Sequence, residues 1–94
     1  EFRFFVTDGE INHVQPYWPP AAIEDHQPSI NEWREVLAEA SELSPAELET
    51  LSDLTRRVSA AVPGFWSVDW LETRDRGFVL IDMAEGEKSY RWEP

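Results

Sequence analysis

Segments in which apolar and polar residues alternate occur as a pair at each end of this chain, and two helix patterns separate the pairs. The first pair spans residues 1–7 and 10–15 and is joined by Asp8-Gly9, a dipeptide that tolerates the left-handed backbone of a tight hairpin turn. The second pair lies within residues 65–84. This order of strand, strand, helix, helix, strand, strand constrains the fold more than any single motif does.

Both helix patterns begin at N-terminal capping sequences. Ser29 and Glu32 have the spacing of a capping box, in which each side chain satisfies a free backbone donor of the first turn. Ser44 and Glu47 have the same spacing, with Pro45 at the first helical position. The positions expected to face the core are Ile30, Trp33, Val36, Leu37 and Ala40 in the first helix and Leu48, Leu51, Leu54, Val58 and Val62 in the second.

Two hairpins that flank a helical segment predict an α+β fold, with an antiparallel or mixed sheet and a two-helix layer on one face. The other face of the sheet is then expected to carry Arg3, Asp69 and Asp82 and to be open to a ligand or a neighbouring domain. Residues 16–28 are rich in proline and are expected to form a loop. That loop can be interpreted as a proline-rich ligand for a partner domain, but a simple connection anchored by its aromatic residues is favoured.

The composition limits the function classes. A chain of 94 residues forms at most one small domain, so residues 1–94 are expected to be a single, partial domain. With 19 Asp and Glu against eight Lys and Arg, the net charge of −11 disfavours nucleic acid and anionic membranes as partners. The absence of Cys excludes disulfides and a cysteine nucleophile. Without a signal peptide or spanning segment in its pattern, the chain is expected to be soluble and cytoplasmic.

Two acids lie on the polar faces of the second strand pair. If the connection at residues 74–77 is an even-length loop, Asp69 lies opposite Asp82. Facing carboxylates repel each other, and a hard cation such as Mg²⁺ removes that cost, so replacing Asp69 by Asn is expected to relieve repulsion and leave the fold intact. The alternative is an odd-length loop with Gly77 as a bulge, which places Trp70 opposite Asp82 and leaves the two acids separately solvated.

Four short runs add a further pattern: Glu1-Phe2-Arg3-Phe4-Phe5-Val6, then Asp8-Gly9-Glu10-Ile11, then Ser67-Val68-Asp69, then Val79-Leu80-Ile81-Asp82-Met83-Ala84-Glu85-Gly86. Together and in this order they resemble the C-terminal half of ATP-grasp enzymes, most closely the divergent phage and bacterial members. The resemblance covers a minority of the residues but fits the whole order of elements. It implies an ATP-dependent carboxylate ligase, which forms an acyl phosphate that an amine or another nucleophile captures.

The resemblance implies roles for three residues on the strands. Arg3 takes the position of the arginine that contacts phosphate oxygens, which makes it both the catalytic and a cofactor-binding candidate. Asp69 takes the position of the first metal carboxylate, and Asp82 takes that of the second, usually a glutamate. Judged from its strand position alone, without the resemblance, the favoured interpretation of Arg3 is an exposed arginine paired with Glu1 or Glu10.

The end of the last strand departs from the family pattern. Ala84 stands where the family has a metal-binding asparagine, and Glu85 is the candidate for a replacement carboxylate if the strand bends. Lys88 is a candidate for contacting nucleotide phosphates, with a solvated tail residue as the alternative. His13 and His26 lack a serine or cysteine partner in the pattern and are expected to be structural.

The resemblance implies ATP and Mg²⁺ as cofactors, and a small-molecule or peptide carboxylate together with a nucleophile as partners. The lysines and the flexible loop that hold the nucleotide lie in the other half of this family. An N-terminal half is therefore expected before Glu1, where the chain opens inside a strand pattern, and residues 1–94 alone are expected to be inactive. The alternative function is a non-enzymatic acidic module that binds a protein partner on its exposed sheet face.

Overall fold

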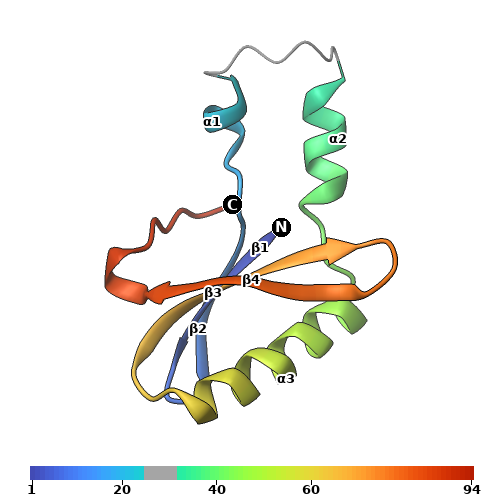
Figure 1. The fold of residues 1–94 in the computed structure, drawn as a ribbon. Helices are drawn as coiled ribbons and strands as arrows, with labels where there is room; N and C mark the ends of the chain where they lie inside the picture. The colour runs from blue at the N-terminus through green and yellow to red at the C-terminus, as the bar shows by residue number, and fades with distance from the viewer. Residues whose placement is uncertain (25–31) are drawn as a thin grey trace.

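A computed structural model of the protein describes residues 1–24 and 32–94. Its elements are β1 (Phe2–Thr7), β2 (Glu10–Pro16), α1 (Pro20–Glu24), α2 (Trp33–Ala40), α3 (Pro45–Ala61), β3 (Phe65–Thr73), β4 (Gly77–Glu85) and the 3-10 helix η1 (Gly86–Lys88) (Figure 1). No helix in these ranges is long and apolar enough to cross a membrane.

The predicted α+β class is confirmed. The strands form one four-stranded sheet in the order β2-β1-β3-β4, and each neighbouring pair is antiparallel. The two hairpins are joined through β1 and β3, so the first and last thirds of the chain share the centre of the sheet (Figure 1). Side chains on β1 and β3 are therefore the best placed to be covered on both faces.

The first hairpin turn forms where the sequence predicted it. Asp8 and Gly9 both have positive φ angles, 46° and 87°, as a two-residue turn matched to the strand twist requires. The turn is tied to the end of α3, because Asp8 Oδ1 accepts a hydrogen bond from the Gly64 backbone N–H at 2.8 Å. The Gly9 N–H donates to Ser59 Oγ at 2.8 Å. These bonds fix the angle between α3 and the sheet.

The capping box of the second helix is confirmed. The Glu47 N–H donates to Ser44 Oγ at 3.1 Å, and the Ser44 N–H donates to Glu47 Oε1 at 3.0 Å, with Pro45 as the first helical residue. α3 then covers one face of the sheet, where Leu51 completes a core formed mainly by β1 and β3. The buried core residues are Phe2, Phe4, Val6, Leu51, Val68 and Trp70.

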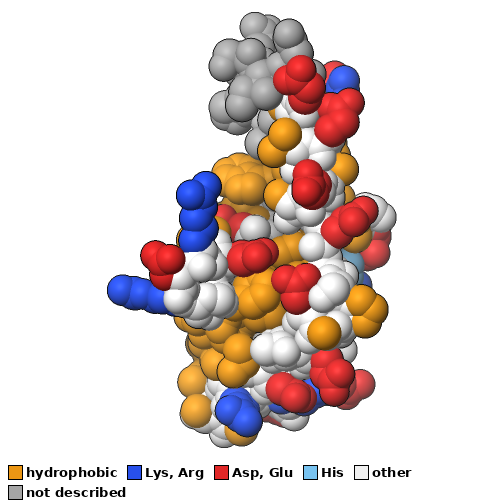
Figure 2. Space-filling model, turned by 90° about the vertical axis from the view of Figure 1, so that its right-hand side faces the viewer, with side chains coloured by type: hydrophobic (Ala, Val, Ile, Leu, Met, Phe, Trp, Pro, Cys, Tyr) orange, Lys and Arg blue, Asp and Glu red, His pale blue; other side chains and the backbone are white. Residues whose placement is uncertain are grey.

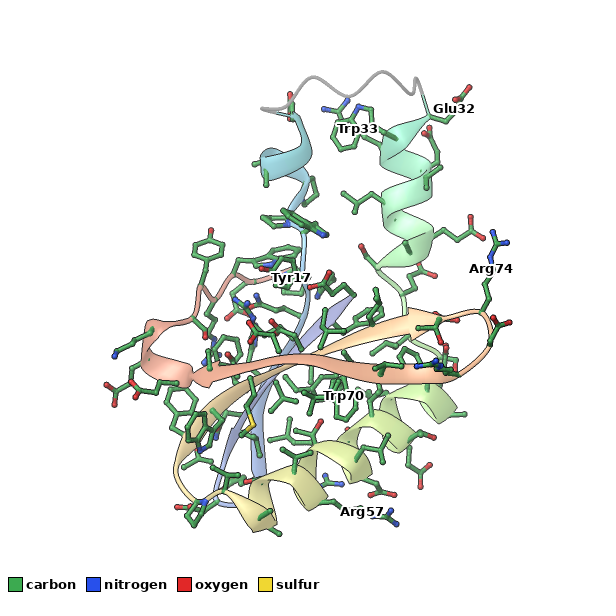
Figure 3. The ribbon with its side chains drawn as sticks, viewed as in Figure 1. Tyr17, Glu32, Trp33, Arg57, Trp70 and Arg74 are labelled. Atoms are coloured by element: carbon green, nitrogen blue, oxygen red, sulfur yellow. The ribbon has the colours of Figure 1, made fainter. Side chains whose placement is uncertain are left out.

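The buried side of α3 differs partly from the predicted apolar stripe. Leu48 is exposed, whereas Thr55 and Ser59 are buried beside Leu51. Thr55 fits there because its hydroxyl donates to the Leu51 carbonyl at 2.7 Å and accepts from Trp70 Nε1 at 3.0 Å. Figure 3 shows Trp70 between the sheet and α3. The hydroxyl thus satisfies the indole N–H that the core would otherwise leave unpaired.

The expected layer of two helices over one face consists of α3 alone. α2 has no buried residue, Val36 is 55% exposed, and α1 and α2 stand together on the side of the sheet opposite α3 (Figure 1). The predicted loop at 16–28 contains the short helix α1, and the Ser29 capping box lies outside the described residues. Within them, α2 follows Glu32, which makes no side-chain cap. The apolar stripe of α2 therefore does not belong to the core.

The hydrogen bond between Thr55 and Trp70 provides a test of this packing. Thr55→Val keeps the side-chain shape but leaves the buried indole N–H without an acceptor, which should cost roughly 1–3 kcal/mol of unfolding free energy. Thr55→Ser retains the hydroxyl and removes one methyl group, so it should lose only about 1 kcal/mol. Urea unfolding followed by tryptophan fluorescence measures both. A Val variant as stable as the Ser variant would contradict the assignment.

Candidate functional site

The turn between β3 and β4 has an odd number of residues, which the sequence analysis gave as the alternative to an even-length loop. Thr73 pairs with Gly77 across a three-residue loop, and Gly77 has a φ of 69°, as the bulge position of such a turn requires. Next to the turn, Leu71 consequently pairs with Val79. The even-length loop predicted from the sequence is therefore wrong.

A second irregularity restores the predicted pairing of the acids. Trp70 pairs with Leu80 and Asp69 pairs with Asp82, so Ile81 is an extra residue on β4. Such a bulge shifts the register by one residue. From Asp82 onward, each residue of β4 therefore lies on the opposite sheet face from the one it would occupy without the bulge. Asp69 thus lies opposite Asp82 as predicted, but through two compensating irregularities rather than through an even loop.

One row of paired positions crosses all four strands. Gln15 pairs with Arg3, Arg3 with Asp69, and Asp69 with Asp82. We call these four residues the polar row. It lies on the sheet face opposite α3, because Phe4, the neighbour of Arg3 along β1, is part of the core under α3.

The centre of the polar row is a buried ion pair. Arg3 donates from Nε to Asp69 Oδ1 at 2.8 Å and from Nη2 to Asp69 Oδ2 at 3.1 Å, a two-bond geometry that gives strong and directional pairing. The side chains of Arg3 and Asp69 are only 12% and 3% exposed. The hydrogen bond to Asp69 raises the pKa of Arg3, so the guanidinium is charged at every pH at which the protein folds.

Two further groups enclose the guanidinium of Arg3. The Tyr17 ring lies 4.7 Å from Cζ, in cation–π geometry, and the Tyr17 N–H donates to the Glu1 carbonyl at 2.9 Å. Arg3 Nη1 donates to the carbonyl of Tyr90 at 3.1 Å. In Figure 3, Tyr17 lies above the sheet, on the side opposite Trp70. The bonds to Asp69 and to the Tyr90 carbonyl use three of the five guanidinium N–H groups, and a hydrogen bond with the Tyr17 side chain also raises the pKa of Arg3.

The face that was expected to be open is covered over β1 and β2 by the C-terminal segment, residues 89–94, whereas Asp82 on β4 stays exposed. Gln15 Nε2 donates to the Tyr90 carbonyl at 3.1 Å, and the Trp92 N–H donates back to Gln15 Oε1 at 2.9 Å. Trp92 Nε1 reaches the Pro16 carbonyl at 3.0 Å. The segment begins after Gly86, where a Cβ atom would lie 2.6 Å from the Phe65 ring, so only glycine fits this path without a shift.

His13 belongs to the same network. Its Nε2 lies 3.2 Å from Gln15 Oε1 and 2.9 Å from the Trp92 carbonyl oxygen, and both atoms are acceptors, so Nε2 carries the hydrogen. This placement is the structural role expected for His13. His26 lies outside the described residues.

Asp82 is the exposed end of the polar row. Its Oδ1 accepts from the Met83 N–H at 2.9 Å. Glu1 lies within electrostatic reach of both aspartates: burial raises the pKa of Glu1, and the charges of Asp69 and Asp82 raise it further, against the lowering effect of the terminal ammonium and Arg3. The sequence suggested Glu1 only as a partner of Arg3; its proximity to the two acids depends on the pairing of β1 with β3.

The carboxylates of the polar row do not form a protein metal cage by themselves. Within residues 1–24 and 32–94, no three His, Cys, Asp or Glu side chains are grouped closely enough to hold a metal. Mg²⁺, however, is commonly bound by one or two carboxylates together with phosphate oxygens and water. Asp69 and Asp82 are the two carboxylates that the strand pairing places opposite each other, and Arg3 occupies two of the about four lone-pair positions of Asp69.

The remaining candidates are not brought to the polar row. Glu85 pairs with Trp66 and forms an ion pair with Lys88, with Oε2 3.1 Å from Nζ. Ala84 pairs with Ser67 on the face of the polar row, so the position of the expected asparagine is correctly oriented but carries no ligand atom. Among the sequence candidates, the structure thus joins Arg3, Asp69 and Asp82 and sets Glu85 and Lys88 apart.

No family model, no curated protein and no solved structure matches this chain. The class of protein is therefore defined by the fold and the polar row: an α+β domain with a buried arginine–aspartate pair next to an exposed aspartate.

The ion pair reverses the expectation that Asp69→Asn preserves stability. A neutral amide at this position would leave the poorly exposed Arg3 without its counter-charge, and breaking a buried pair in this way should cost roughly 3 kcal/mol. Asp82→Asn is the matched control, because Asp82 is exposed and should change stability by less than about 0.5 kcal/mol. Urea unfolding at neutral pH compares them, and equal effects of the two substitutions would contradict the role of the pair.

Proposed function

We propose that this chain is the phosphate- and metal-binding half of a cytoplasmic ATP-dependent carboxylate ligase of the ATP-grasp type. The observation that carries the proposal is the placement of Arg3, Asp69 and Asp82 at paired positions of three adjacent strands, β1, β3 and β4. A fixed cation next to two facing carboxylates is the arrangement that phosphoryl transfer to a carboxylate needs. The substrates would be a small-molecule or peptide carboxylate and a nucleophile.

In this proposal Arg3 orients phosphate. Its guanidinium is held in one plane by Asp69 and by the Tyr17 ring, so its N–H groups have fixed directions. Fixed donors stabilise charge that develops on phosphate oxygens without having to reorganise during the reaction. The Tyr90 carbonyl oxygen accepts a hydrogen bond from Arg3 Nη1, so this nitrogen already has an oxygen acceptor beside it.

Asp69 and Asp82 would hold Mg²⁺, which would neutralise the negative charge of the phosphates. Asp69 is rigid because Arg3 fixes both its oxygens, and Asp82 is accessible from solvent. With Ala84 in place of an asparagine, two carboxylates hold the ion instead of a larger protein cage, and it should bind weakly without phosphate. Lys88 forms an ion pair with Glu85, so this proposal does not use it as a phosphate ligand.

The alternative function, an interaction module that uses its exposed sheet face, receives less support at this site. Residues 89–92 lie over β1 and β2 on that face and bond to Arg3, His13 and Gln15. A protein partner would first have to displace these bonds. A metal ion could approach Asp82 from solvent without displacing them, because Asp82 is exposed.

Metal binding can be tested with Mn²⁺, which replaces Mg²⁺ and broadens the nuclear magnetic resonance signals of nearby amides. We expect broadening centred on residues 69 and 82, and we expect Asp82→Asn to remove it because one of the two carboxylates is lost. Asp75→Asn, an exposed acid in the β3–β4 turn, is the control and should change nothing. Broadening spread evenly over the acidic surface, or unchanged in Asp82→Asn, would reject the site.

Catalysis is tested in the full-length protein by ADP release with candidate carboxylates. Asp82→Asn should reduce turnover by roughly 10²-fold or more, in line with the removal of one preorganised electrostatic contact from a transition state. It should leave the unfolding transition nearly unchanged, because Asp82 is exposed. Asp75→Asn again serves as the control. Equal turnover in the two variants would remove Asp82 from the proposed mechanism.

A further inference from the structure

Three indole rings from distant parts of the chain meet at one surface hollow. Trp18 follows β2, Trp33 begins α2, and Trp92 belongs to the C-terminal segment. Together with Leu37 and Glu42 they line a hollow of about 490 Å³, which we call the tryptophan groove. Its size is that of a site for a ligand or for a few side chains of a peptide. It is separate from the polar row, none of whose residues lines it.

The walls of the groove are held by interactions within the chain. Trp92 Nε1 donates to the Pro16 carbonyl at 3.0 Å, which fixes one wall to β2. The guanidinium of Arg34 lies 4.7 Å from the Trp33 ring centre and 3.3 Å from Glu24, so α2 is linked to α1. Figure 3 shows Trp33 on the side of α2 that faces α1. Because an ion pair between exposed side chains contributes little, the wall formed by Trp92 and β2 is the more firmly held of the two.

The apolar side chains of the groove are not part of the hydrophobic core. Trp18 is 47% exposed, and α2 has no buried residue although it carries Trp33 and Leu37. A hydrophobic helix face that the fold leaves exposed gains about 25 cal/mol for each Å² that a partner covers. Exposed tryptophans with fixed surroundings are also the residues that most often dominate binding energy.

The charged side chains around the groove favour a partner with a positive charge. Arg34 is neutralised by Glu24, and Arg91 by Glu93, at 3.3 and 3.6 Å. Glu42 lines the groove and forms no ion pair with any residue the structure describes. The acidic side chains that Figure 2 shows along α2 lie on its side facing away from α1, so they add to the negative charge of the chain and not to the lining of the groove. A positively charged partner is therefore attracted, whereas a nucleotide or a second copy of this chain, at −11, is repelled.

We propose that the tryptophan groove binds a basic amphipathic segment of a partner protein. Bulky apolar side chains of that segment would enter the space between Trp18, Trp33 and Trp92, and its Lys or Arg side chains would pair with Glu42. This is the helix-in-groove mode of recognition combined with complementary charge. The proposal is independent of the ligase function, because it uses different residues.

The first test compares three synthetic peptides by tryptophan fluorescence and amide chemical shifts. An amphipathic helical peptide of Leu and Lys should bind and shift the amides of α2 and residues 17–20. The same peptide with Glu at every Lys position should not bind, and a Lys and Ser peptide without Leu should bind at least roughly tenfold more weakly. Equal binding of the acidic peptide, or of the peptide without Leu, would overturn the proposal.

The second test uses matched variants with the Leu and Lys peptide. Trp18→Ala and Leu37→Ala should each weaken binding roughly tenfold, as expected for central interface residues. Ile81→Ala removes a side chain that is 45% exposed on β4, outside the groove, and should have no effect. Since α2 has no buried residue, Leu37→Ala should not unfold the protein.

The charge component is tested with one further pair. Glu42→Gln should weaken binding a few-fold and reduce its salt dependence, whereas Glu49→Gln, an exposed acid on α3, should leave both unchanged. The proposal would be overturned if Glu42→Gln and Glu49→Gln had equal effects. It would also be overturned if Trp18→Ala and Leu37→Ala weakened binding no more than Ile81→Ala does. A dimer in sedimentation that Trp18→Ala abolishes would overturn it as well, because the groove would then belong to a second copy of the chain.

Discussion

The ion pair between Arg3 and Asp69 is the interaction on which the organisation of this protein depends. Two charges that are almost withdrawn from water are costly unless each finds its partner, and here the two hydrogen bonds supply it across the central strands β1 and β3. The pair fixes the register of the strands that join the two hairpins. It also creates the need for further polar cover, which Gln15, Tyr17 and the Tyr90 carbonyl provide.

The polar row explains why the two faces of the sheet are covered so differently. On one face, apolar side chains of β1 and β3 pack against α3, and even the buried hydroxyl of Thr55 is matched to the indole of Trp70. On the other face, an apolar helix stripe would bury charged and amide groups without partners. An extended segment can offer its own carbonyls and N–H groups, as residues 89–92 do.

The apolar stripe of α2 takes no part in this cover. The C-terminal segment occupies part of the second face, and Trp33 and Leu37 of α2 line the tryptophan groove instead of packing on the sheet. One polar row is therefore linked to both candidate activities of the protein. It forms the proposed phosphate- and metal-binding site, and it leaves exposed indoles at the groove for which we propose a basic partner.

Much of this architecture could be predicted from the sequence, because it depends on neighbouring residues. The Asp8-Gly9 turn, the Ser44 capping box and the alternation of the strands gave the elements and the α+β class.

The site was predicted only in part. Bulges at β1–β2 and β3–β4 change the register by one residue, and it is the first that places Gln15 rather than Val14 opposite Arg3. A bulge has no reliable sequence signal, and contacts between residues 66 to 87 positions apart, such as Arg3 with Asp69 and Tyr90, form only when the whole sheet does. The sequence by itself determined the local elements, and the tertiary structure decided the pairing of charges, because desolvation and partner choice depend on what the folded chain brings together.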